Sequence, residues 1–166
     1  MLALAQWLSG TPMSLAIHEL DWLVPLLQTV HIIAIAMVVS SVFMIELRLL
    51  RVVKSQSIAD TAHRFVPWIW TGLAILAVTG ITLIIAEPQR ALHNPAFQLK
   101  MLLLALAIAF ICVFQISLGG KSKFWFHADQ SRPAVKLLVA VLAISVFMLW
   151  CAIAFAGRLI AYLQPG

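Results

Sequence analysis

The sequence predicts an all-α integral membrane protein, folded as a four-helix transmembrane bundle with a short N-terminal interfacial helix. Two observations support this fold class. Of the 166 residues, 63% are apolar and only 10% are charged, whereas a soluble domain carries about 25% charged residues. Four long apolar segments also follow one another, and each is long enough to cross a bilayer, which takes about 20 residues. We therefore expect a single transmembrane domain over residues 1–166.

Sequence signals mark the ends of the four expected spans. The spans are expected at about residues 22–47, 67–86, 97–118 and 133–162. Pro67 is expected to open the second span and Pro133 the fourth, because proline suits the first turn of a helix. Gly119 and Gly120 follow the third span, where glycine favours helix termination.

The N-terminal region is apolar but too interrupted to cross the membrane. Gly10, Thr11 and Pro12 break it, and Thr11–Pro12 is typical of a helix start, with threonine as the N-cap. We expect a short helix at about residues 11–20 that lies in the membrane interface, with Trp7 as an anchor.

The distribution of basic residues predicts the orientation of the bundle. Eight basic residues lie around the links after the first and third spans, namely Arg48, Arg51, Lys54, Arg64, Lys121, Lys123, Arg132 and Lys136. The opposite side holds only Arg90, Lys100 and Arg158. Because basic loops stay in the cytoplasm, both termini are expected on the outer, periplasmic side of a bacterial inner membrane.

This clustering also accounts for the formal net charge of +5. Nucleic acid is therefore not an expected partner, because the basic residues follow membrane topology and form no separate basic surface. The expected partners are the lipid bilayer and other membrane protein subunits.

The first span contains a histidine, His31, with Gln28 one turn earlier on the same helical face. Polar groups inside a bilayer are costly, so each is a candidate functional group. Three interpretations of His31 stay open at this point. The side chain forms a packing contact with Gln28 or another helix, serves as an axial ligand of haem b, or hydrogen-bonds a quinone or relays protons.

The other four histidines, His18, His63, His93 and His127, lie near the ends of the expected spans. No second axial ligand at the depth of His31 is therefore evident from the sequence. A haem would depend on His31 alone, or on a partner supplied by a folded-in loop or another subunit.

A second set of polar residues is expected at the outer ends of the helices. Lys100 and Arg158 each lie within an apolar segment close to its end, and Asn94 precedes the third span. The two cations either extend to the headgroups or converge near His31 on an anion such as a haem propionate, a lipid phosphate or a partner carboxylate. His31, Gln28, Asn94, Lys100 and Arg158 are thus the candidate haem, quinone or lipid site.

Glu46 and Arg48 lie at the inner end of the first span, in the string IELRLLR. We expect a structural role for both, fixing the depth of the helix at the membrane boundary. The sequence contains no GxSxG, HExxH, Walker or CxxC motif and no pair of carboxylates within a span. Catalytic residues are therefore not expected, and the protein is not expected to be an enzyme.

Several motifs together resemble a known family. They are His31, the acidic–Leu–Arg–Leu–Leu string Glu46–Leu50, Asn94–Phe97 with Lys100, and Gly157–Ile160. The chain resembles an uncharacterised bacterial family of small four-helix inner-membrane proteins, a domain of unknown function. The resemblance covers nearly the whole chain, and it implies the fold and no established activity. The family usually has Asp at position 46, Gly at position 51 and Arg at position 98, where this chain has Glu46, Arg51 and Gln98.

The expected function is that of a non-enzymatic membrane subunit or accessory protein in a larger redox or energy-transducing complex. Its cofactor is unknown from the sequence, with haem b and quinone as the candidates for the site around His31. One alternative is a stand-alone b-type haem electron carrier that interacts with quinone. A second alternative is a small oligomeric transporter or metal-handling protein.

Overall fold

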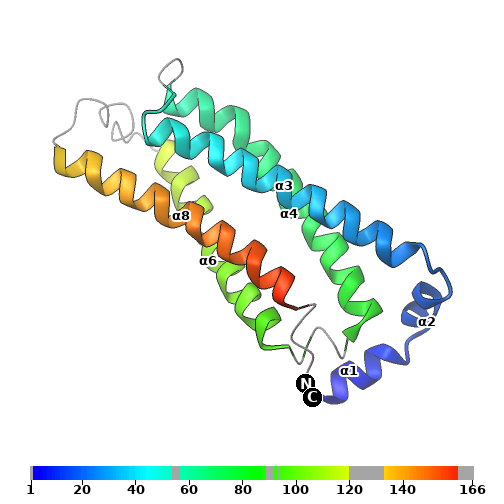
Figure 1. The fold of residues 1–166 in the computed structure, drawn as a ribbon. Coiled ribbons are helices and arrows are strands. Elements are labelled where there is room, and N and C mark those ends of the chain that lie inside the picture. Colours follow the sequence, from blue (N-terminus) through cyan, green and yellow to red (C-terminus); the bar gives the residue numbers. More distant parts are fainter. Residues whose placement is uncertain (1, 54–56, 89–91, 93, 120–132, 161–166) are drawn as a thin grey trace.

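The computed structural model describes residues 2–53, 57–88, 92, 94–119 and 133–160, and all regular structure in these ranges is helical (Figure 1). The four long helices are α3 (Leu23–Leu49), α4 (Ile58–Ala86), α6 (Pro95–Gly119) and α8 (Pro133–Leu159). Each of them contains a segment long and apolar enough to cross a membrane. The predicted fold class, an all-α bundle of four apolar spans, is confirmed.

Two short helices precede the bundle, where the sequence predicted one. They are α1 (Leu2–Ser9) and α2 (Pro12–His18), and both pack against α4. Thr11 is the N-cap of α2, and its side-chain oxygen accepts the N–H of Ser14 at 3.4 Å. Pro12 occupies the first turn, where its missing N–H costs little. The expected helix start at Thr11–Pro12 is therefore present, and α1 is an addition.

The second long helix begins earlier than the sequence predicted. Ser57 caps α4 by accepting the N–H of Asp60 at 3.0 Å, and the helix continues through Pro67. The expectation that Pro67 opens this helix was wrong, because Ser57 supplies a stronger start signal upstream. The proline lacks one backbone donor, a defect that helices in membrane bundles tolerate.

The end of α3 carries a strained residue. Arg51 has a φ of 63°, the left-handed region that favours glycine. The N–H of Val52 bonds the Leu47 carbonyl at 3.0 Å, and the N–H of Arg51 bonds the Arg48 carbonyl at 3.1 Å. These two bonds form a Schellman motif, in which Arg51 takes the position that usually holds glycine.

The bundle consists of two helix pairs, with α3 beside α4 and α6 beside α8 (Figure 1). The α3–α4 pair is the most tightly packed. A Cβ placed on Gly72 of α4 would lie 2.5 Å from Val38 Cγ2 and 3.4 Å from the Ala34 carbonyl oxygen, both on α3. Small residues of this kind allow membrane helices to approach closely. Helix α8 also packs against α3, and this contact joins the two pairs.

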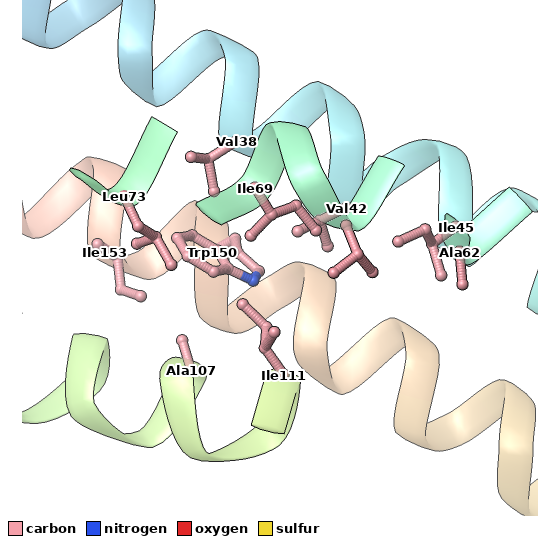
Figure 2. Close-up of a cluster of buried hydrophobic side chains, with 11 residues drawn as sticks. Val38, Val42, Ile45, Ala62, Ile69, Leu73, Ala107, Ile111, Trp150 and Ile153 are labelled. Carbon is pink, nitrogen blue, oxygen red and sulfur yellow. The ribbon is translucent and has the colours of Figure 1, made fainter. Parts of the chain in front are cut away.

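The buried core lies between these helices, around the indole of Trp150, which is 3% exposed (Figure 2). The cluster comprises Val38, Val42, Ile45, Ala62, Val66, Ile69, Leu73, Ala107, Ile111, Trp150 and Ile153. Since lipid tails are as apolar as these side chains, close packing rather than burial from water stabilises such a core.

The antiparallel course of the helices gives the bundle two ends (Figure 1). Helices α3 and α6 begin, and α4 and α8 end, at what we call the His31 end. The basic end lies opposite, where α3 ends and α8 begins, and it carries Arg48, Arg51, Arg64 and Lys136. Lys54, Lys121, Lys123 and Arg132, which were counted for the orientation, lie outside the described residues.

Candidate functional site

His31 is joined to the neighbouring helix α4 by a hydrogen bond. Its Nδ1 lies 2.7 Å from the hydroxyl oxygen of Thr79. Thr79 is buried and His31 is half-buried. His31 lies eight residues after Leu23, at the start of α3, which puts it roughly 12 Å along the helix axis at 1.5 Å per residue. The imidazole is therefore held inside the bundle, below the His31 end.

The hydrogen bonds of Thr79 fix which ring nitrogen of His31 carries the proton. The Thr79 hydroxyl also lies 2.7 Å from the carbonyl oxygen of Ile75, one turn earlier on α4. A carbonyl can only accept, and a threonine has one hydroxyl proton. Thr79 therefore donates to Ile75, and its oxygen accepts the Nδ1–H of His31. The other ring nitrogen, Nε2, is left with a free lone pair.

This tautomer suits a ligand-binding histidine. Histidines that bind a metal usually donate their second ring N–H to a neighbouring acceptor, which fixes the ring orientation. The Thr79 hydroxyl is such an acceptor for His31. Among the described residues, no hydrogen bond occupies the Nε2 of His31. The ring therefore presents an oriented lone pair that can accept a proton donor or bind a metal ion.

Lys100 of α6 is a second polar group in this part of the bundle. Its side chain is half-buried, and its ammonium lies within electrostatic range of the His31 imidazole. A Cβ placed on Gly157 of α8 would lie 3.4 Å from Lys100 Nζ and 3.8 Å from its Cδ. The lysine stem thus runs along α8 at Gly157. At this end of the bundle, His31 and Thr79 thus join α3 to α4, and Lys100 and Gly157 join α6 to α8.

Asn94 fixes the two helices that carry Lys100 and Gly157. Its side chain is 0% exposed. The Oδ1 accepts the N–H of Ala96 at 2.9 Å and so caps the start of α6. The Nδ2 donates to the carbonyl of Ile160 at the end of α8, at 3.2 Å. Asn94 is therefore positioned as a brace between helix ends.

Two other residues of the predicted site have exposed side chains. Gln28 is exposed, and no hydrogen bond joins it to His31 within the described part of the chain. Of the two packing contacts expected for His31, with Gln28 or with another helix, the structure shows the second, through Thr79 on α4. Arg158 is also exposed, although it follows Gly157 directly. The structure thus brings together His31 and Lys100, while Gln28 and Arg158 face outward.

The described residues include no group of three or more His, Cys, Asp and Glu side chains that could hold a metal ion. Of the candidate second haem ligands, His93 lies outside the described residues, and so does the side chain of His18. His63 is exposed near the start of α4, at the basic end. Arg90 and His127 also lie outside the described residues.

The two residues with an expected structural role are both buried near the basic end. Glu46 is 4% exposed and Arg48 is 9% exposed. Within the described residues, Glu46 Oε1 and the indole nitrogen of Trp150 are buried without a hydrogen-bond partner. A buried carboxyl of this kind is costly in a membrane, so its position at the end of α3, and not at its centre, is physically reasonable.

The sequence interpretation missed Thr79. A single threonine within a span is common, because its hydroxyl can bond a carbonyl of its own helix, as in Thr71 and Thr82. The usable signal was its depth. Thr79 lies seven residues before the end of α4, and His31 lies eight residues after the start of α3. In an antiparallel pair of helices, these positions fall at the same level.

Comparison with known proteins identifies a family and no characterised relative. No curated protein and no solved structure matches the chain. A family model described as a family of unknown function, DUF6644, matches residues 23–163. The match begins at the first residue of α3 and covers all four spans. The chain therefore belongs to the DUF6644 family of unknown function.

Proposed function

We propose that this protein is a non-enzymatic membrane subunit of a redox complex, and that His31 contacts a redox-active ligand in the bilayer. The observation that supports this most directly is the hydrogen bond between His31 and Thr79. It holds the imidazole in one tautomer and leaves the Nε2 lone pair free. The same bond joins α3 to α4, so His31 can serve in packing and in ligand binding together.

The favoured ligand is the headgroup of an isoprenoid quinol. A quinol carries hydroxyl groups, and one of them can donate a hydrogen bond to the Nε2 of His31. The ammonium of Lys100 lies within electrostatic range of the same ring. It can donate a hydrogen bond to a quinol or quinone oxygen. The apolar surroundings of the spans suit the isoprenoid tail, which partitions into the bilayer. His31 Nε2 can accept from a quinol hydroxyl, and Lys100 can donate to a quinone carbonyl. The two side chains together therefore suit both redox states.

A b-type haem is the second candidate, since His31 Nε2 is also a suitable axial ligand. Haem supplies four nitrogen ligands itself, so a cluster of metal-binding side chains is not required. Lys100 would suit a propionate. The described residues supply one axial ligand at this depth, His31, so the fit to haem is partial. Haem, when bound, would provide one-electron transfer, and the protein would then act as the stand-alone electron carrier expected as an alternative.

The orientation is part of the same proposal. The basic residues gather at one end of the bundle, and the positive-inside rule supports a cytoplasmic position for that end. The His31 end then faces the outer side of a bacterial inner membrane, where both termini would lie. A ligand at His31 would be bound in the outer leaflet.

A partner subunit is supported by the packing of α6. Only 11% of the most apolar 18-residue stretch of α6 is buried within the chain, compared with 33% of the corresponding stretch of α3. Helix α6 therefore presents most of its surface outward while carrying Lys100 on its inner side. Retention of the protein in a larger assembly on a native gel after mild solubilisation would support a subunit role, and migration as a pure monomer would contradict it.

Ligand binding is tested with a short-chain ubiquinol analogue and the purified full-length protein in detergent. We expect His31→Ala to weaken binding about ten-fold, which corresponds to the loss of one hydrogen bond of about 1.4 kcal/mol. The matched control is Gln28→Ala, one turn away on the same helix and exposed, which should leave binding unchanged. Equal affinity of the wild-type protein and His31→Ala would overturn the proposed site.

The haem candidate is tested separately by a reduced-minus-oxidised visible spectrum of the same preparation. A Soret and α-band pair that is lost in His31→Ala would replace quinol by haem as the ligand. A band that survives the substitution would show that His31 is not the axial ligand.

A further inference from the structure

The basic end of the bundle contains a groove that the proposed function does not use. It lies between the end of α3 and the start of α8, with a cavity volume of about 350 Å³, within the range of small-ligand sites, roughly 300–1,000 Å³. Its lining residues in the described part of the chain are Leu49, Leu50, Arg51, Lys136, Leu137, Val139 and Ala140. Two of these side chains are cationic, and the other five are apolar.

The groove lies at the level where lipid headgroups meet the hydrocarbon core. Helix α3 ends at Leu49, and Lys136 lies in the first turn of α8, so the groove is at one end of both helices. Arg51 and Lys136 therefore lie at the membrane boundary. The leucine, valine and alanine side chains form the part of the lining that would contact the hydrocarbon. Leu137, which follows Lys136, is 66% exposed, so an alkyl chain can lie against it from the bilayer side.

The charges on this groove are not the ones that helix stability would select. Lys136 lies in the first turn of α8, where the partial positive charge of the helix terminus disfavours a cation. Arg51 occupies a left-handed backbone position at φ 63°, where glycine would be unstrained. Both cations thus carry a local cost, and both line one groove.

We propose that this groove binds an anionic phospholipid, with its phosphate between Arg51 and Lys136 and an acyl chain along Leu50, Leu137 and Ala140. A phosphate oxygen can accept from a guanidinium and an ammonium together. The apolar lining distinguishes a lipid from a free phosphate ion, which would gain nothing from it. The site lies at the opposite end of the bundle from His31 and does not depend on the ligand proposed there.

The test is native mass spectrometry of the full-length protein with phosphatidylglycerol or phosphatidylcholine added to detergent micelles. The wild-type protein should bind the anionic lipid in preference to the zwitterionic one. Each cation near a membrane surface contributes about five-fold to the affinity for acidic lipid. We therefore expect Arg51→Gly and Lys136→Gln each to weaken phosphatidylglycerol binding about five-fold, and the double variant about 25-fold.

The variants are chosen so that misfolding does not confuse the result. Glycine suits the backbone at position 51, so Arg51→Gly should fold at least as well as the wild type. The matched control is Arg64→Gln, which removes an exposed charge near the start of α4, outside the groove. It should leave the lipid preference unchanged.

Three results would overturn the proposal. They are equal binding of the two lipids by the wild type, an undiminished preference in the double variant, and displacement of phosphatidylglycerol by inorganic phosphate at the same concentration as by added lipid. The last result would show a free-anion site. His31→Ala is expected to keep the full lipid preference, so failure of either proposal can be told from failure of the other.

Discussion

The Nδ1 of His31 donates to the Thr79 hydroxyl at 2.7 Å, and the Thr79 hydroxyl donates to the Ile75 carbonyl at the same distance. The bond connects α3 and α4 at one level of the bundle and decides the state of the whole ring. A side chain on the neighbouring helix thus determines which nitrogen of His31 faces a ligand. The candidate site is therefore defined by a pair of residues and not by His31 alone.

Replacing Thr79 with valine tests how much this bond contributes to the free energy of unfolding. The two side chains have a similar shape, so the change removes the hydroxyl and leaves the Nδ1–H of His31 without an acceptor. We expect a loss of about 1–2 kcal/mol in the free energy of unfolding, measured by reversible unfolding in mixed micelles. Thr79→Ser should restore most of the stability.

The control for this change is Thr82→Val, on the same helix. The Thr82 hydroxyl bonds only the Val78 carbonyl of its own helix, at 2.9 Å. Its loss should change stability by no more than a few tenths of a kcal/mol, because it joins no second helix. Equal losses for the two threonines would show that the contact with His31 contributes nothing.

The close approach of α3 and α4 predicts opposite effects of alanine at two glycines of α4. A Cβ at Gly72 would lie 2.5 Å from Cγ2 of the fully buried Val38, whose branched side chain has little rotamer freedom in a helix. At Gly80, the nearest atom would be His31 Cε1 at 3.6 Å, an ordinary contact. Gly72→Ala should cost about 1–3 kcal/mol of unfolding free energy, whereas Gly80→Ala should be neutral or stabilising by up to about 1 kcal/mol.

The steric origin of the Gly72 effect can be checked by a second change in α3. Val38→Ala removes the methyl group that a new Cβ would meet, so it should recover part of the loss when it is combined with Gly72→Ala. Additive losses in the double variant would mean that the two positions do not touch and that the α3–α4 packing described here is wrong.

Asn94 should matter for stability through two separate bonds. Asn94→Ala removes the N-cap of α6 and the bond to Ile160 on α8, and we expect a loss of about 2 kcal/mol. Asn94→Ser keeps a capping oxygen and loses the donor to Ile160, so its cost should be smaller. Unfolding free energies that do not differ between the two variants would contradict the capping role.

Arg51 offers a prediction in the stabilising direction. Its φ of 63° lies in a region that costs an L-residue with a side chain roughly 1–2 kcal/mol. Arg51→Gly should therefore raise the free energy of unfolding by about 1 kcal/mol. Leu50, the preceding residue, has a φ of −75°, so Leu50→Gly should lower stability. A loss at both positions would mean that the side chain of Arg51 stabilises the fold by more than its backbone strain costs.

The sequence predicted the helical bundle well because the signal for each span is strong. A run of about 20 apolar residues has few other structures available in a bilayer, and the start of α2 at Thr11–Pro12 and of α8 at Pro133 agree with capping rules. The start of α4 was predicted wrongly at Pro67, because the N-cap signal of Ser57 lies ten residues upstream of it. Membrane helices tolerate internal proline, so proline marks their ends less reliably than it does in water.

The site was only partly predictable, for a physical reason. His31 and Lys100 stand out because each carries a polar group in an apolar segment. Their partners do not, since Thr79 can satisfy its hydroxyl within its own helix and Gly157 has no side chain. Gln28 was assigned to the site by its spacing from His31 on one helix. Which residues of other helices meet at a given depth follows from the pairing of α3 with α4 and of α6 with α8, and helical periodicity alone does not give this pairing.

The proposed tautomer of His31 and its contact with a quinol are tested most directly by ¹⁵N NMR. The protein carries labelled histidine and is measured in micelles with and without a ubiquinol analogue. The ring resonances of His31 are assigned by their absence from the spectrum of His31→Ala. We expect a protonated Nδ1 and an unprotonated Nε2 in the free protein, with the Nε2 resonance shifting most when the quinol is added. A protonated Nε2 in the free protein, or no shift at either nitrogen with the quinol, would contradict this expectation.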